Sequence, residues 1–179
     1  MPIKICKPYR EAKPNHLTQG FSKEHQAVDF GYRYGTFLVA PEDCRIFAIT
    51  TSESIDEKLE GLARGYGVFM EALGNPKRRY GYWHCLPIFP VKIGDIVNQG
   101  QIVGQMGNSG FVISGGEFVP VEIRTKKPYR GTHLHWSMAI DNVPQNPLDF
   151  INWEIEIKYD IFTAIRNILN RILVLLKRK

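Results

Sequence analysis

Short apolar runs separated by turn residues constrain the fold of this chain more than any other feature. Residues 36–40 (TFLVA) and 45–50 (RIFAIT) flank the turn PEDC, and residues 66–73 (YGVFMEAL) and 80–86 (YGYWHCL) flank GNPKRR. Runs of this length, bounded by Gly, Pro, Asn and Asp, are typical of strands. The sequence therefore predicts a mainly β fold, a compact antiparallel sheet of the barrel-sandwich kind. Residues 54–65 are compatible with a short helix or with a solvated excursion between two strands.

Residues 91–110 (VKIGDIVNQGQIVGQMGNSG) place turn residues at close intervals between short apolar pieces. Glycine allows the positive φ angles that tight turns require, so this stretch is predicted to coil back on itself. The pattern is similar to that of biotinyl and lipoyl carrier domains. A carrier domain needs a lysine that can be modified in the tight turn, and NQGQ offers none.

The hydrophobic period changes near the C-terminus. Residues 151–159 (INWEIEIKY) alternate between apolar and polar and predict a strand, whereas the apolar residues of 161–176 recur at helical spacing. Asp160 is a plausible N-cap for that helix. We therefore divide the chain into a domain of residues 1–159 and an amphipathic basic helix in residues 160–179. Its apolar stripe could pack on the chain's own core, on a second copy of the protein or on a membrane surface.

Composition narrows the classes of partner. The 179 residues contain 23 Lys and Arg against 18 Asp and Glu, a net charge of +5. Neither basic cluster, at residues 126–130 and 177–179, interleaves aromatic side chains as a nucleic-acid surface would, so no nucleic-acid partner is expected. The longest apolar run of the C-terminal segment, ILVLL, is far shorter than the roughly 20 residues that span a bilayer. The start shows no signal peptide, which predicts synthesis in the cytoplasm.

The histidines are the main candidates for metal binding and catalysis. Of the 5 in the chain, His133 and His135 would share one face of a strand, with Leu134 on the other. His25 lies four residues before Asp29, and imidazole and carboxylate are both good zinc ligands. Each motif alone also fits ordinary hydrogen-bonded surface residues.

A strand over YGYWHCL would place Tyr82 and His84 on one face, and Trp83 and Cys85 on the other. His84 could then face a groove while Cys85 faces the core. The three cysteines, Cys6, Cys44 and Cys85, are far apart in sequence, which argues against a disulfide scaffold.

Together these motifs resemble the lysostaphin/LytM-type zinc peptidases, which cut peptide bonds in bacterial peptidoglycan. That family carries His-x-x-x-Asp, then Tyr-x-His, then a Gly-Asp…Gly-Gln segment that leads to Gly-Asn-Thr-Gly, then His-Leu-His. This chain reads HQAVD, YWH, VKIGDIVNQGQIVGQMGNSG and HLHW in the same order, and the resemblance covers residues 17–150.

The resemblance implies one Zn²⁺ per chain and assigns roles to seven residues. The expected metal ligands are His25, Asp29 and His135, the expected catalytic residues are His133 and His84, and the expected substrate-binding residues are Tyr82 and Asn108. Three protein ligands leave a position open for water, as in catalytic zinc sites. Because no His-Glu-x-x-His motif supplies a general base, a histidine is the natural replacement. Which of the two catalytic histidines acts as proton acceptor stays open.

The chain departs from the family at several places. Ala27 and Cys44 stand where the family usually has glycine, and residues 111–130 exceed the usual short loop and predict an extra hairpin or flap beside the groove. The expected substrate is a stem or cross-bridge peptide of peptidoglycan. Release during phage lysis, carriage on a virion, or a precursor with a leader outside this sequence would bring the enzyme to the wall. Two rival hypotheses are a catalytically silent binding module of the same fold and a cysteine peptidase with Cys85 as nucleophile.

Overall fold

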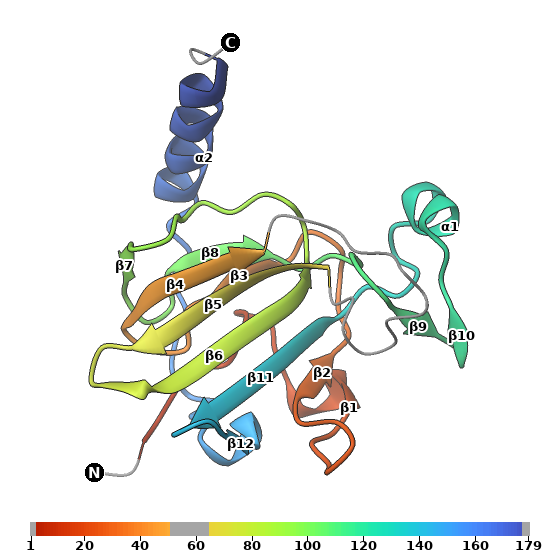
Figure 1. Ribbon diagram of the computed structural model, residues 1–179, viewed down its shortest axis with the longest axis horizontal. Helices are drawn as coiled ribbons and strands as arrows, with labels where there is room; N and C mark the ends of the chain where they lie inside the picture. Colours follow the sequence, from red (N-terminus) through yellow and green to blue (C-terminus); the bar gives the residue numbers. More distant parts are fainter. Residues whose placement is uncertain (1–2, 51–64, 177–179) are drawn as a thin grey trace.

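The computed structural model describes residues 3–50 and 65–176 (Figure 1). The strands are β1 (Leu17–Gln19), β2 (Val28–Phe30), β3 (Phe37–Val39), β4 (Cys44–Thr50), β5 (Tyr66–Ala72), β6 (Asn75–Cys85), β7 (Ile96–Val97), β8 (Ile102–Gln105), β9 (Ile113–Ser114), β10 (Glu117–Phe118), β11 (Leu134–Ile140) and β12 (Val143–Gln145). The helices are α1 (Val121–Lys126) and α2 (Ile161–Leu176), with 3-10 turns at Pro14–His16 and Pro147–Asp149. The mainly β prediction is confirmed.

One antiparallel sheet organises the molecule. Its strands follow the order β1-β2-β11-β6-β5-β4-β7, and β12 pairs with the outer part of β11. Two small two-stranded sheets, β3 with β8 and β9 with β10, complete the fold. The central position of β11, between β2 and β6, brings residues from three distant parts of the sequence to one place on the sheet (Figure 1).

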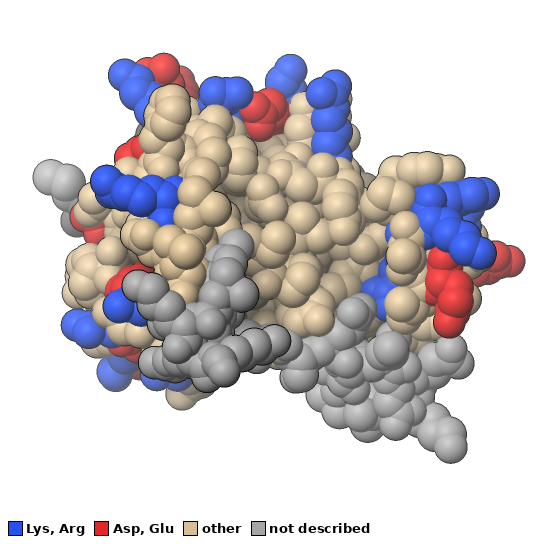
Figure 2. Space-filling model, turned by 90° about the horizontal axis from the view of Figure 1, so that it is seen from above, with Lys and Arg blue, Asp and Glu red and all other residues tan. Residues whose placement is uncertain are grey.

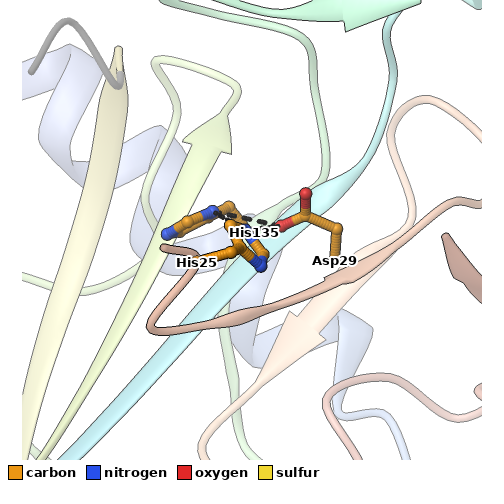
Figure 3. Close-up of side chains that lie close together, drawn as sticks. All are labelled: His25, Asp29 and His135. Carbon is orange, nitrogen blue, oxygen red and sulfur yellow. Dashed lines mark hydrogen bonds and ion pairs between the residues drawn. The ribbon is translucent and has the colours of Figure 1, made fainter. Parts of the chain in front are cut away.

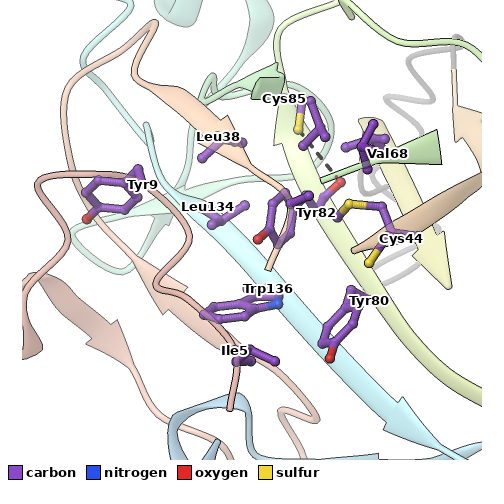
Figure 4. Packing of buried hydrophobic residues seen from close by; sticks show 14 of the residues in the cluster. Ile5, Tyr9, Leu38, Cys44, Val68, Tyr80, Tyr82, Cys85, Leu134 and Trp136 are labelled. Atoms are coloured by element: carbon purple, nitrogen blue, oxygen red, sulfur yellow. Dashed lines mark hydrogen bonds between the residues drawn. The ribbon is translucent and has the colours of Figure 1, made fainter. Parts of the chain in front are cut away.

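The core lies against one face of this sheet (Figure 4). Trp136 on β11 and Tyr82 on β6 are register partners, and their rings meet edge to face with centroids 5.8 Å apart. Both residues are fully buried, as is Leu134. Burial of Leu134 and Trp136 confirms that they face away from the neighbouring histidines. Truncating a buried Trp to Ala costs about 3–5 kcal/mol, so this pair anchors the strands that carry the site.

The predicted strand over residues 151–159 is wrong. Ile151 forms only an isolated bridge to Ile5, and no ladder follows it within the described residues. The alternation nevertheless corresponds to the burial of apolar side chains, because Ile157 is buried and Trp153 and Tyr159 pack against the two hydrophobic clusters. Apolar alternation shows which side chains face the core, but it does not show whether the backbone has a strand partner.

Three further predictions concern a turn, the extra segment and the C-terminal helix. The turn predicted over residues 74–79 is shorter, because β6 begins at Asn75. The extra segment at residues 111–130 forms the β9–β10 hairpin followed by α1, as expected. The helix predicted over residues 161–176 is α2, and Asp160 caps it by accepting a hydrogen bond from the Thr163 backbone N–H at 2.9 Å. Residues 54–64 lie outside the described part of the chain.

Charged residues are interspersed on the face seen from above. In Figure 2, Lys and Arg lie beside Asp and Glu around its margin, and uncharged residues occupy most of the middle. The excess positive charge is therefore not gathered into one patch on this face.

Candidate active site

Backbone pairing places two of the predicted metal ligands opposite each other. Asp29 on β2 and His135 on β11 are register partners in adjacent antiparallel strands. His25 comes from the turn that precedes β2, where the Ser22 hydroxyl accepts a hydrogen bond from the His25 backbone N–H at 3.0 Å. This turn folds His25 back toward the strand pair (Figure 3).

The three side chains converge on one point. The Nε2 atom of His25 lies 3.3 Å from Oδ1 of Asp29 and 3.2 Å from Nδ1 of His135, and Nδ1 of His135 lies 3.1 Å from the same carboxylate oxygen. Ligand atoms about 2.1 Å from a tetrahedral zinc ion lie about 3.4 Å from one another. The observed triangle therefore has the size of one face of a zinc coordination tetrahedron.

Hydrogen bonding fixes the tautomer of the neutral His25 ring. Its Nδ1 lies 3.1 Å from the Gly20 carbonyl oxygen, and a carbonyl can only accept, so Nδ1 carries the proton. The neutral ring then presents the lone pair of Nε2 toward Asp29. Oδ1 of Asp29 is buried, and ring nitrogens of His25 and His135 lie 3.3 and 3.1 Å from it. A lone pair that faces a buried carboxylate oxygen calls for a cation between them, so these residues fit a zinc ion.

Electrostatics favour the ionised carboxylate. Burial of Asp29 is the largest influence and raises its pKa, but the hydrogen bond from His135 and the charges of His133, His135 and His25 together bring the pKa below its usual value. Asp29 is thus held as a carboxylate, the form that binds a metal.

The two predicted catalytic histidines lie next to this triad. Their rings are 4.5 Å apart between centroids, and His84 lies 5.9 Å from the His135 ring. His133 Nδ1 donates to the Gly131 carbonyl at 2.8 Å, and His84 Nδ1 donates to the Ser109 carbonyl at 2.7 Å. In each neutral ring Nε2 can therefore accept a proton.

His84 reaches the site through an unusual backbone conformation. It has a φ of +59°, in the left-handed region that a non-glycine residue seldom adopts. This interrupts the alternation at the end of β6, so Tyr82 and His84 do not share a face. His84 lines the groove, while Tyr82 and Cys85 are both buried in the core. Strain of this kind persists where the surroundings fix it, and here the hydrogen bond to Ser109 holds the ring.

A groove of about 600 Å³ contains all five of the metal and catalytic positions. The other lining residues are Thr18, Gln19, Glu24, Gly31, Phe111, Ile113, Ser114, Gly115, Tyr129, Gly131 and Thr132. Beyond His25 and His135 a second hollow of about 280 Å³ continues over the open face of the sheet, past Phe69, Gly81 and Ser137. The triad therefore lies partway along a surface channel rather than at its end.

The extra segment of residues 111–130 forms one wall of this groove. Phe111, Ile113 and Tyr129 line it, and the Phe111 ring stacks on Phe118 with centroids 4.9 Å apart. Sequence reasoning missed these wall residues individually. The only signal was the length of the segment, since no motif marks them.

The two predicted substrate-binding residues do not face the groove. Tyr82 is fully buried, and its hydroxyl donates to the Val39 carbonyl at 2.8 Å, so it has no surface on which to bind substrate. Asn108 is buried and donates to the carbonyls of Pro128 and Arg130, at 3.0 and 3.1 Å. Asn108 therefore fastens the end of the extra segment.

Cys85 is unsuited to the role of nucleophile. It is fully buried, its thiol donates to the Tyr82 carbonyl at 3.7 Å, and burial raises its pKa well above the usual value. A reactive cysteine needs access and a stabilised thiolate. The cysteine-peptidase hypothesis is wrong for this residue.

A groove with three candidate metal ligands and two adjacent histidines, on an antiparallel sheet, is the arrangement expected of a metal-dependent hydrolase. Residues 23–147 match Peptidase family M23, and the chain belongs to this family. Among curated proteins, none matches it in sequence.

Solved structures agree on the fold. A putative peptidase M23 from Pseudomonas aeruginosa has a TM-score of 0.58 at 22% identity, over 84% of this chain and 52% of that one. Lysostaphin from Staphylococcus simulans, described as an antimicrobial peptidase, has a TM-score of 0.56 at 20% identity, over 84% and 55%. A zinc-containing peptidase from Vibrio cholerae has 0.57 at 16%, over 80% and 39%. The chain thus spans about half the length of the first two of these structures and 39% of the third.

Proposed function

We propose that this protein is a zinc-dependent endopeptidase that hydrolyses stem or cross-bridge peptides of bacterial peptidoglycan. The observation that carries the proposal is the convergence of His25, Asp29 and His135, within 3.1–3.3 Å of one another, in a chain of Peptidase family M23. The two histidines of the groove support it, because they provide proton-transfer groups beside the metal position.

A zinc ion held by these three residues would polarise a substrate carbonyl and lower the pKa of a coordinated water to about 7. Nε2 of His133 lies 3.8 Å from Oδ2 of Asp29, which places it nearest the metal position and suits it to accept a proton. His84 lies behind it, with Nδ1 fixed by Ser109, and suits hydrogen bonding to the developing oxyanion or protonation of the leaving amine.

The shape of the site favours a polymeric substrate. The groove continues on both sides of His25 and His135, so a peptide chain can lie across the ligands with the scissile bond in its middle. Peptidoglycan is the substrate that the sequence motifs indicate. Access to the wall after cytoplasmic synthesis would follow from release during phage lysis or from carriage on a virion, which we include in the proposal.

The rival is a catalytically silent module that binds wall peptides. Purified cell walls of several cross-bridge chemistries, incubated with the zinc-loaded protein, should release new amino termini that sequencing of the peptides identifies. A chelator should stop the release, and added zinc should restore it. Binding to walls without any new amino terminus, by protein that contains zinc, would establish the silent module instead.

A further inference from the structure

The C-terminal helix α2 presents its apolar side away from the protein. Ile161, Ile165, Leu169 and Leu173 follow one another at intervals of four, and each such step rotates by only about 40° around the helix axis. Phe162 falls in the same sector of roughly a third of the circumference. All five side chains are exposed, with Phe162 89% exposed and Leu169 and Leu173 54% each.

The opposite side of α2 contacts the body of the molecule. Ala164 is 5% exposed and packs in the cluster that contains Ile157 and Ile102. Thr163, Ala164 and Asn167 line a hollow against the loop of residues 98–102. A helix that packs on its own domain normally turns its apolar stripe inward. Here the small and polar side faces inward, so the core formed by residues 3–50 and 65–160 does not cover the stripe.

Figure 1 shows the same relation at the level of the ribbon. The N-terminal end of α2 adjoins the sheet region, and the rest of the helix extends away from it toward the C-terminus. None of the described helices is long and apolar enough to cross a membrane. At 16 residues α2 is about 24 Å long, which suits a helix that lies in the plane of a surface.

The charge of this segment indicates which kind of partner covers the exposed apolar stripe. From Ile161 to the end, the sequence contains Arg166, Arg171, Lys177, Arg178 and Lys179 and has no Asp or Glu. Two copies that met through these segments would bring like charges together. An anionic lipid surface would instead attract every charge in the segment and accept the apolar side chains between its headgroups. We propose that α2 docks the protein on anionic lipid bilayers, with the exposed apolar stripe in the interface. This inference does not depend on the peptidase activity.

Vesicle co-sedimentation with the full-length, zinc-loaded chain tests it. Vesicles of equal parts phosphatidylcholine and phosphatidylglycerol should bind the protein, vesicles of phosphatidylcholine alone should bind it far less, and added salt should weaken binding. The exposed double variant Ile165→Gln/Leu169→Gln should lower partitioning at least about tenfold. Arg166→Gln should lower it about fivefold on anionic vesicles only.

The matched control is Ile93→Gln, which removes another exposed isoleucine, outside the helix, and should leave partitioning unchanged. Glutamine preserves helix propensity, and circular dichroism with zinc content verifies that each variant is folded. The proposal is overturned if the protein does not bind vesicles or if binding does not depend on lipid charge. It is also overturned if the double variant partitions as strongly as the unchanged chain. A lipid-free dimer that the double variant converts to monomer also overturns it and assigns the stripe to a second copy.

Discussion

Nδ1 of His135 lies 3.1 Å from Oδ1 of Asp29, and the two residues are register partners on β11 and β2. Two of the three candidate ligands therefore take their separation from strand pairing. Only His25 depends on a turn, which the Ser22 hydroxyl closes. A site on paired strands is held more precisely than one on loops, so we expect the ligand triangle to persist without the metal.

The ligand assignment predicts that Asp29→Asn loses zinc. An amide is a poor zinc ligand, and two histidines remain. The affinity should fall by more than the roughly 10- to 100-fold that loss of an outer-sphere partner costs. Metal analysis after gel filtration measures this directly. Asp141→Asn is the matched control, because Asp141 is an exposed carboxylate paired with Lys77, and asparagine tolerates its φ of +53°. Full zinc occupancy in the Asp29 variant would refute the assignment.

The histidine roles predict a separation of metal binding from catalysis. His133→Ala and His84→Ala should each retain zinc but lose about 100-fold or more in kcat, the usual weight of general acid–base catalysis. His16→Gln is the control, since His16 packs beside the rings of Tyr9 and Tyr32 and does not line the groove. Loss of zinc together with activity in His133→Ala would make His133 a ligand, and unchanged cleavage would remove its role altogether.

The burial of the cysteines predicts inertness toward thiol reagents. Cys6, Cys44 and Cys85 are all buried, and burial raises the pKa values of the Cys6 and Cys44 thiols to about 12. The native protein should therefore resist iodoacetamide up to about pH 9 and remain active, whereas a chelator should abolish activity. Mass spectrometry counts the alkylated thiols. Stoichiometric alkylation of the native protein accompanied by inactivation would reopen a cysteine mechanism.

Periodicity in the sequence predicted most of the strands and α2, whereas the resemblance to a known family singled out the five residues that line the groove. Sequence reasoning failed where geometry depends on a single backbone angle or on distant partners. The φ of +59° at His84 turns its side chain into the groove while Tyr82 stays in the core, and no local sequence pattern predicts this angle. Residues 151–159 alternate in burial without joining a ladder, because partner strands lie beyond any local pattern. Asn108 belongs to a recognisable motif, but its hydrogen bonds to Pro128 and Arg130 involve a segment particular to this chain.

The backbone around His84 predicts a cost for Gly65→Ala. Gly65 has a φ of +71°, and an added Cβ would lie 2.4 Å from the Ser109 carbonyl carbon. Gly35→Ala is the matched control, because Gly35 has a φ of +80° but open space around the new Cβ. Both variants lose about 1–2 kcal/mol to the left-handed conformation. Gly65→Ala should lose a further 1–3 kcal/mol, roughly the cost of overpacking, and should lower kcat by moving the carbonyl that holds His84. Denaturant unfolding and kinetics measure the two effects, and equal behaviour of the two variants would contradict the argument.

The predicted domain boundary between residues 159 and 160 can be tested by two truncations. A chain that ends at Tyr159 loses α2, in which Ala164 is the one buried side chain among those that the structure describes. Its free energy of unfolding should therefore stay close to that of the full chain, and it should keep zinc. A chain that ends at Ile155 also loses buried Ile157, worth about 1.5–3 kcal/mol, and Tyr159, whose hydroxyl donates to the Phe37 carbonyl at 3.2 Å. The shorter chain should therefore be clearly less stable in denaturant. If the chain that ends at Tyr159 is insoluble or free of zinc, α2 belongs to the domain and the boundary is misplaced.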